Sequence, residues 1–281
     1  MMGSAEGSQP PPAPLRVGLV GATGRMGRAL LDVLSESPWA ERMTLVAAWS
    51  ASPAAAAAGS VAPRPLDAAS LEAAAPGIDV VIDFSVAPVT PWLAGRCAEH
   101  RVALVSGTTG MDAQQHAQLD AAAARIPLLW APNMSPGVNL MLELVKVAGR
   151  SFERVYGEAL DIEMVESHHR AKLDAPSGTA LRLGQVVAEA IGRDLAQALV
   201  FDRANRTGAR TPGSIGVSVV RAGDIAGEHT VIFAADGERL EVTHRATDRR
   251  LFARGALGAA HWLVGQAPGH RYDMGHVLGL S

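Results

Sequence analysis

The sequence predicts an α/β protein of two parts, a Rossmann-like dinucleotide-binding domain followed by an α+β domain. Length is the first reason, because 281 residues suit roughly two domains. The second reason is that the pattern of apolar residues changes near Met134. Before it, short apolar runs alternate with helical patterns; after it, strand-like runs follow one another closely. The third is a glycine-rich turn directly after the first apolar run.

Residues 15–134 are predicted to form a doubly wound parallel sheet, because near-continuous apolar strands alternating with helices are typical of a sheet covered on both faces. The first strand precedes a helical pattern in which Met26, Leu30 and Val33 share one stripe. Ligands of such sheets bind at the carboxyl ends of the strands. Residues 51–65 are low in complexity and are expected to form a mobile loop. The expected strands cover residues 15–20, 43–49, 79–84, 102–106 and 126–131.

Residues 135–281 are predicted to form the second domain, with an open mixed, mostly antiparallel sheet. The glycine-containing turns at residues 223–228 and 236–237 indicate antiparallel hairpins. Because an open sheet leaves an edge or face to be covered, this sheet is a candidate oligomer surface. The expected helices cover residues 138–150 and 178–193, and the expected strands cover 159–167, 215–222, 229–235 and 238–246.

The composition of the chain limits which classes of partner it can bind and in which cellular compartment it is expected. A net charge of −3 gives no basic field for nucleic acid or an anionic membrane. No apolar run approaches the ~20 residues of a membrane span, and residues 1–14 read as a disordered tail rather than a signal peptide. We therefore expect a cytoplasmic protein that binds neither nucleic acid nor membrane. The single cysteine, Cys97, leaves no disulfide framework and is expected to be a buried apolar residue.

The turn "GATGRMG" places Gly21, Gly24 and Gly27 between a strand and a helix. Glycines allow backbone N–H groups to approach a pyrophosphate at the positive end of that helix. A glycine-rich turn without a ligand is the alternative. The acidic residue that usually binds the ribose of NAD at the end of the second strand is missing, and Ser50 stands there instead. Arg25 is the nearest cation in sequence, so NADPH and NADH both stay open.

The stretch "ESHHRAKLDAPSGTA", residues 166–180, predicts a site for a small carboxylic acid. Ser177 is a suitable cap for a helix whose first turn contains Gly178 and Thr179, so their unpaired amides can bind an anion. Lys172 is one of only two lysines in a chain with 25 Lys and Arg. Lysine, unlike arginine, can release a proton. Chance placement of this lysine, as for Lys146, is the alternative.

The two histidines of this stretch, His168 and His169, are adjacent on a strand end and are expected to point to opposite faces. One of them is therefore expected to face the reaction while the other binds or packs. No metal site is expected here, because no nearby carboxylate completes a histidine-rich ligand set.

With these residues the chain resembles the 4-hydroxy-tetrahydrodipicolinate reductase (dihydrodipicolinate reductase) family of lysine and diaminopimelate synthesis. The resemblance runs from about Arg16 to the C-terminus. It rests on "GATGRMG", "IDFS", "SGTTG", "APNMSPGVN", "ESHHRAKLDAPSGTA", "GSIGVSVVRAGDIAGEHTV" and "ERLEVTHRA". It implies reduction of 4-hydroxy-tetrahydrodipicolinate to tetrahydrodipicolinate by hydride from NADPH or NADH.

The resemblance also implies roles for individual residues. His168 and Lys172 are implied to be the acid pair, and His169, Gly178 and Thr179 to hold the substrate carboxylates. Residues 248–281 are implied to pack back on the first domain, and the C-terminal sheet to build a homotetramer. The cofactor-binding residues that it implies, together with Ser50, are Gly21, Ala22, Thr23, Gly24, Arg25, Met26, Gly107, Thr108, Thr109, Ala131, Pro132, Asn133 and Met134.

Other functions remain possible from the residues alone. A dehydrogenase acting on a semialdehyde or a sugar joins the same two kinds of domain, without needing the double histidine and "DAPSGT". A dinucleotide-binding sensor keeps the glycine loop and needs no proton donor. A purely structural partner leaves the cation cluster unexplained.

Overall fold

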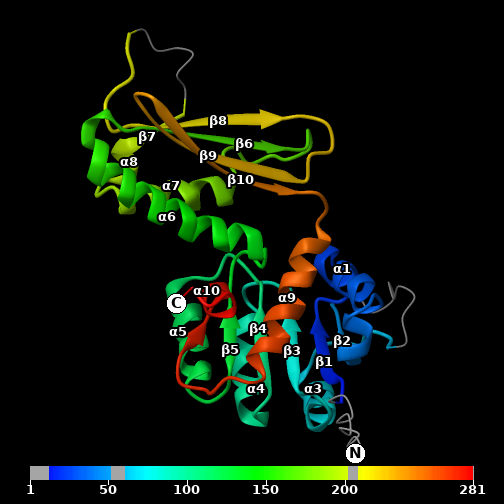
Figure 1. The fold of residues 1–281 in the computed structure, drawn as a ribbon. Helices are drawn as coiled ribbons and strands as arrows, with labels where there is room; N and C mark the ends of the chain where they lie inside the picture. Colours follow the sequence, from blue (N-terminus) through cyan, green and yellow to red (C-terminus); the bar gives the residue numbers. More distant parts are fainter. Residues whose placement is uncertain (1–12, 52–60, 202–207, 281) are drawn as a thin grey trace, which may run out of the picture. The chain divides into compact units, whose positions relative to one another are not determined.

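A computed structural model describes residues 13–51, 61–201 and 208–280 of the chain (Figure 1). Most of the predicted N-terminal tail and of the predicted mobile loop lies outside these residues. The chain forms two compact units. Unit 1 comprises Met1–Pro132 and Ala256–Asp273, and unit 2 comprises Asn133–Gly255 and Met274–Ser281.

Unit 1 is built on a parallel sheet with the strand order β11-β5-β4-β3-β1-β2. This confirms the predicted Rossmann-like sheet. Its strands are β1 (Leu15–Val20), β2 (Met43–Trp49), β3 (Val80–Asp83), β4 (Ala103–Ser106), β5 (Leu128–Trp130) and β11 (Arg271–Tyr272). Its helices are α1 (Arg25–Leu34), α2 (Trp39–Arg42), α3 (Ala68–Ala74), the 3-10 helix η2 (Ala75–Gly77), α4 (Thr90–His100), α5 (Ala113–Ala123) and the later part of α9 (Arg250–Leu263).

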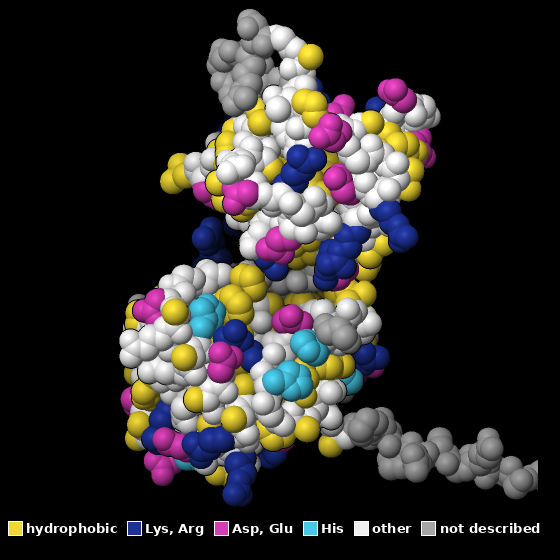
Figure 2. Space-filling model, turned by 90° about the vertical axis from the view of Figure 1, so that its left-hand side faces the viewer, with side chains coloured by type: hydrophobic (Ala, Val, Ile, Leu, Met, Phe, Trp, Pro, Cys, Tyr) yellow, Lys and Arg dark blue, Asp and Glu magenta, His cyan; other side chains and the backbone are white. Residues whose placement is uncertain are grey.

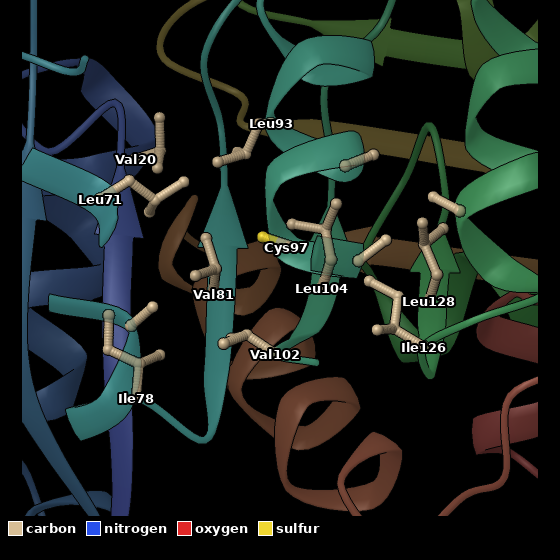
Figure 3. Packing of buried hydrophobic residues seen from close by; sticks show 14 of the residues in the cluster. Val20, Leu71, Ile78, Val81, Leu93, Cys97, Val102, Leu104, Ile126 and Leu128 are labelled. Atoms are coloured by element: carbon tan, nitrogen blue, oxygen red, sulfur yellow. The ribbon is translucent and has the colours of Figure 1, made fainter. Parts of the chain in front are cut away.

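The core of unit 1 explains why the sequences of these strands are almost entirely apolar. Every residue of β3 and β4 is buried, since helices cover both faces. Val81 and Leu104 of adjacent strands pack with Leu93 and Cys97 of α4 (Figure 3). Cys97 is 2% exposed, and burial raises the pKa of its thiol. The expectation of a small apolar core residue is confirmed.

Unit 2 contains a mixed sheet with the order β10-β9-β6-β8-β7. Its strands are β6 (Asp161–His168), β7 (Leu199–Val200), β8 (Ile215–Arg221), β9 (Gly227–Ala235) and β10 (Glu238–Ala246). Its helices are α6 (Pro136–Tyr156), the 3-10 helix η3 (Gly157–Ala159), α7 (Gly178–Ala190), α8 (Leu195–Ala198) and α10 (Met274–Val277). Apolar residues of α6 and α7, including Val145 and Val187, pack on Met164 and Phe233 of the sheet. In Figure 1 both helices lie on the same side of the sheet.

One predicted hairpin is confirmed and the other is wrong. β9 and β10 pair antiparallel around the turn at Gly237, which has a φ of +88°. β8 and β9 do not pair, because β6 lies between them, parallel to β8 and antiparallel to β9. The connection from β8 to β9 crosses the end of β6, where Ala222 N donates to His168 O at 2.9 Å. Non-local pairing of β6 therefore overrode the local turn signal.

The surface agrees with the charge balance of the sequence. Acidic and basic side chains lie interspersed on the face shown in Figure 2. Among the helices of the described residues, none is long and apolar enough to cross a membrane.

Candidate active site

The stretch 166–180 runs from the last residues of β6 into the N-terminus of α7. Ser177 caps α7, as predicted, with its Oγ accepting from Ala180 N at 3.2 Å. The amides of Gly178 and Thr179 precede this first capped amide, and Gly178 is exposed. Since first-turn amides lack intrahelical partners, they form an anion site that a carboxylate suits.

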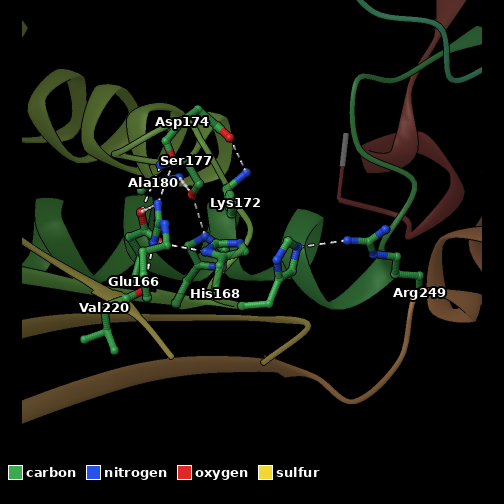
Figure 4. A network of polar contacts seen from close by, with 11 residues as sticks. Glu166, His168, Lys172, Asp174, Ser177, Ala180, Val220 and Arg249 are labelled. Atoms are coloured by element: carbon green, nitrogen blue, oxygen red, sulfur yellow. Dashed lines mark hydrogen bonds and ion pairs between the residues drawn. The ribbon is translucent and has the colours of Figure 1, made fainter. Parts of the chain in front are cut away.

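A buried carboxylate, Glu166, organises the end of β6 (Figure 4). Its side chain is 1% exposed, and the guanidinium of Arg221 donates a hydrogen bond to each of its oxygens, at 2.8 and 2.9 Å. It also accepts from His168 Nδ1 at 2.5 Å and from Ser177 N at 3.0 Å. Burial acts to raise the pKa of Glu166, but these hydrogen bonds together hold it below its usual value. The carboxylate is therefore ionised, and both of its oxygens already accept hydrogen bonds.

His168 is held in one tautomer by this carboxylate. Because Nδ1–H donates to Glu166, Nε2 is the ring nitrogen left to face a ligand. Burial lowers the pKa of His168, and the hydrogen bond and charge of Glu166 oppose this only in part. Nε2 of the neutral ring is a hydrogen-bond acceptor. Gly227 lies against it, and an added Cβ there would come within 3.1 Å of Nε2.

His229 of β9 completes the buried group, opposite Glu166 in the sheet. Its Nε2 lies 3.0 Å from Ser177 Oγ, and its ring meets His168 edge-on with centroids 5.2 Å apart. Burial lowers the pKa of His229 to about 4. Ser177 Oγ therefore accepts from Ala180 and donates to a neutral His229, which fixes the cap of the anion site.

Lowering the pH from 7 to 4 is expected to reduce the free energy of unfolding, with a contribution of about 3 kcal/mol from His229. Its folded pKa of about 4 lies below the unfolded value of 6.5. The unfolded chain therefore takes up the proton first, and stability present above pH 6.5 is lost as the pH falls. Urea unfolding at a series of pH values measures this. His229→Gln should flatten the dependence and His261→Gln, on the exposed side of α9, should not; equal slopes would contradict the assignment.

The two other predicted basic residues also have partners. Lys172 Nζ lies 2.8 Å from Asp174 Oδ1, and its side chain is 21% exposed. His169 is half-buried, and its Nε2 lies 3.0 Å from Arg249 Nη2. His168 and His169 thus have separate surroundings, as expected for adjacent residues at a strand end.

Sequence reasoning missed Glu166, Arg221, His229 and Arg249. A signal existed for Glu166, because it stands two residues before His168 and so shares its face of the strand. Arg221 and His229 reach the site through the non-local pairing of β8 and β9 with β6. No local pattern marks them.

The reason given against a metal site is wrong, since the structure places a carboxylate beside the histidines. Ligand atoms of Glu166, His168 and His229 lie within 4.8 Å of one another. Both carboxylate oxygens are already paired with the guanidinium of Arg221, however, and a cation bound there would face that charge. This donor set suits the positioning of His168 better than the binding of a cation.

In unit 1 the glycine loop fits a dinucleotide. Gly21 has a φ of +86°, and a Cβ at Gly27 would overlap Gly21 O, so only glycine allows this close turn. Gly24 is the N-cap of α1 and provides no side-chain cap, which leaves the amides of Arg25 and Met26 facing outward for a pyrophosphate. Ser85, beside the loop, has a buried Oγ with no hydrogen-bond partner in the described part of the chain.

A second loop of unit 1, Gly107–Thr109, is fixed by the buried Asp83 at the end of β3. Asp83 Oδ2 accepts from the hydroxyls of Thr90, Ser106 and Thr108 at 2.6, 2.9 and 3.1 Å. Trp130 Nε1 donates to Thr108 O at 2.8 Å. A side chain at Gly107 would overlap the ring of Phe84. The predicted nicotinamide loop is thus rigid and lies at the carboxyl ends of β3 and β4.

The segment Ala131–Met134 is divided between the units. Ala131 N donates to Ser106 O at 3.1 Å within unit 1. In unit 2, Asn133 Nδ2 donates to Thr179 Oγ1 at 3.4 Å, so the segment is tied to the anion site of α7. Met134 is buried at 2% exposure.

Comparison with known proteins gives a consistent result. Residues 15–134 and 137–278 match the families described as dihydrodipicolinate reductase, N-terminus and C-terminus. A 4-hydroxy-tetrahydrodipicolinate reductase of Alkalilimnicola ehrlichii is 49% identical over 269 residues, covering 94% of this chain and 99% of the relative. One of Chromohalobacter salexigens is 46% identical, covering 95% and 99%. The structure of dipicolinate-bound dihydrodipicolinate reductase from Paenisporosarcina sp. TG-14 shares 25% identity with a TM-score of 0.71, covering 92% and 97%.

Proposed function

The chain belongs to the dihydrodipicolinate reductase family, and we propose that the group around His168 and Lys172 binds the substrate and supplies its proton. The reaction is the reduction of 4-hydroxy-tetrahydrodipicolinate to tetrahydrodipicolinate by NAD(P)H, in lysine and diaminopimelate synthesis. It consumes one proton and releases one water. The observation that carries the proposal is the open end of α7 beside Lys172 and the neutral, oriented His168.

The substrate carboxylates are bound by three residues. The amides of Gly178 and Thr179 receive one carboxylate at the N-terminus of α7, where the helix dipole favours negative charge. His169 binds the other, and Arg249 adds a permanent positive charge through its contact with His169 Nε2. The dicarboxylate dipicolinate bound to the related structure supports a ligand of this class.

Lys172 is the proton donor and His168 orients the substrate. The Lys172 ammonium is held by Asp174 and carries a proton that it can give to the ring. Neutral His168 cannot donate from Nε2; it accepts a hydrogen bond there from an O–H or N–H of the substrate. The carboxylate of Glu166 keeps this tautomer fixed through the cycle.

The dinucleotide supplies hydride when bound. Residues of unit 1 would hold it: the loop from Gly21 to Met26 would bind the pyrophosphate, Ser50 the ribose, and Gly107–Thr109 the nicotinamide half. Ala131, Pro132, Asn133 and Met134 would line the nicotinamide. Residues 15–134 thus serve as the dinucleotide-binding domain and 135–281 as the substrate-binding and oligomerisation domain. Of the predicted returning segment 248–281, only Ala256–Asp273 belongs to unit 1.

The chain works as a cytoplasmic homotetramer assembled through the sheet of unit 2. α6 and α7 cover one face of this sheet, and no helix of the described residues covers the other (Figure 1). Val165, Val220 and Ile232 lie on that second face, and Val220 is 40% exposed. A second copy of the chain is the occupant that suits such a face.

Turnover tests the proposed function directly. Substrate made by condensing pyruvate with aspartate semialdehyde is mixed with the protein and reduced nicotinamide, and the nicotinamide absorbance is followed. Loss of absorbance that depends on the condensation product is the expected result. Dinucleotide binding without turnover would instead support a sensor.

Gly27→Ala is expected to weaken dinucleotide binding at least about tenfold, because the added methyl group displaces the loop that holds the pyrophosphate. Fluorescence titration with NADPH measures it. Gly95→Ala in α4 is the matched control, since no atom lies within 4 Å of an added Cβ there. Unchanged affinity in the Gly27 variant would remove this loop from the binding site.

A further inference from the structure

In unit 2, α6 and α7 each begin at a buried serine that contacts a histidine of the sheet. For α7 these two residues are Ser177 and His229. For α6 they are Ser135, which is 1% exposed, and His244 of β10. Ser135 Oγ accepts from Val138 N at 3.2 Å and lies 3.5 Å from His244 Nε2. The same kind of cap is thus present at the start of both helices.

The two histidines are neighbours in the sheet. His229 and His244 lie directly opposite each other on the antiparallel strands β9 and β10. Side chains of directly opposite residues share one face of a sheet, with their Cβ atoms about 5 Å apart. Because each ring contacts the capping serine of a different helix, the starts of α6 and α7 lie side by side over this pair of strands.

The ring of His244 packs against the first turn of α6. A Cβ added at Gly137 would come within 2.6 Å of His244 Cδ2, so only glycine allows this close approach. Burial lowers the pKa of His244, and the ring is therefore neutral at neutral pH. Its Nδ1 is buried without a hydrogen-bond partner in the described part of the chain, which is costly. An apolar side chain would avoid that cost, so the contact of Nε2 with Ser135 is what the histidine contributes here.

Hydrogen bonds lead from Ser135 to the anion site through Asn133. Ser135 N donates to Asn133 Oδ1 at 2.9 Å. Asn139 Nδ2 donates to the carbonyls of Asn133 and Ser135, both at 2.8 Å. With its Oδ1 engaged in this way, the Asn133 amide directs Nδ2 to Thr179 Oγ1 at 3.4 Å. Thr179 is therefore held by its hydroxyl as well as by its place in the first turn of α7.

We propose that His244 is a positioning residue of this site, which fixes Ser135 and thereby holds Thr179 in place for the substrate carboxylate. The proposal rests on the proposed function, because it concerns the carboxylate that binds there. His244 acts through the residues between it and the anion site rather than by touching the ligand. Such a contact favours bound substrate and transition state equally, so its loss should raise KM and leave kcat nearly unchanged.

Binding of dipicolinate, the dicarboxylate in the related structure, is measured by calorimetry in the presence of NADPH. His244→Leu removes Nε2 and is expected to weaken this binding about fivefold, the worth of one hydrogen bond. KM should rise by the same factor, with kcat within about twofold of the wild-type value. His244→Gln keeps an acceptor near the position of Nε2 and should restore most of the affinity. Val242→Ala, two residues earlier on the same face of β10, is the matched control, because it removes core packing and leaves Ser135 untouched.

A double variant tests the route from His244 to the ligand. Thr179→Val removes the hydroxyl that Asn133 contacts, so adding His244→Leu in this background should weaken dipicolinate binding no further. Losses that add in full would show that His244 acts on the stability of the fold instead. Ser135→Ala removes the same hydrogen bond from its other partner and should reproduce the loss of affinity, which keeps the test open if His244→Leu does not fold.

Unchanged dipicolinate affinity in His244→Leu, or in Ser135→Ala should the first variant not fold, would overturn the proposal. A loss of equal size in Val242→Ala would also overturn it, as would a His244→Gln variant that binds as weakly as His244→Leu. A wild-type chain that binds no dipicolinate, or that shows no turnover, would count against the proposed function itself.

Discussion

Lys172→Met is expected to lower kcat by about 10²–10⁴-fold, the range that a positioned acid contributes. Methionine keeps a side chain of similar length without a proton to donate. Its former partner Asp174 is 60% exposed and stays solvated, so the fold should be unaffected. Steady-state assays with freshly condensed substrate measure kcat, and dinucleotide titration checks that unit 1 is intact.

The chain supplies its own control for this variant. Lys146, the only other lysine, is paired with Glu143 on α6 at 3.2 Å. Lys146→Met should leave kcat unchanged. Turnover retained in the Lys172 variant would show that another group donates the proton.

Glu166→Gln is expected to lower kcat about a hundredfold. It is also expected to shift the acid limb of the pH profile, the fall of kcat/KM at low pH. In the wild-type chain, kcat/KM should fall as the pH drops below 6.5, because burial keeps the pKa of His168 under that value and the neutral ring is the working form. Glu166 raises the pKa of His168 by hydrogen bond and charge. Its removal therefore shifts the limb to lower pH.

The shift of this limb separates positioning from folding. Losing the carboxylate leaves Arg221 with only the carbonyls of Val220 and Asp174 as partners and its charge uncompensated. This is expected to cost about 3 kcal/mol of stability, which urea unfolding reports independently. His168→Gln should abolish the limb altogether. A limb at the same pH in wild type and Glu166→Gln would mean that another group titrates there.

Local signals predicted much of the fold and of the candidate site. The strand, glycine turn and helix around Gly21 required no distant contact, and neither did the capped helix after Ser177. The hairpin of β9 and β10 follows from its short turn. Each of these features is determined by a few consecutive residues, so the sequence pattern alone predicts it.

Strand pairings between residues far apart in the sequence could not be predicted from the sequence pattern. β6 separates β8 from β9, and this brings Arg221 and His229 to Glu166. The energy of these pairings comes from burying whole strands, so no turn residue or motif near them reveals the partner.

The most direct measurement is a crystal structure of the chain with dinucleotide and dipicolinate. One ligand carboxylate is expected on the amides of Gly178 and Thr179, with Lys172 Nζ turned from Asp174 to within ~3 Å of the ligand and His168 Nε2 facing it. A ligand bound away from the start of α7, or a lysine still paired with Asp174 and pointing away from the ring, would contradict the account.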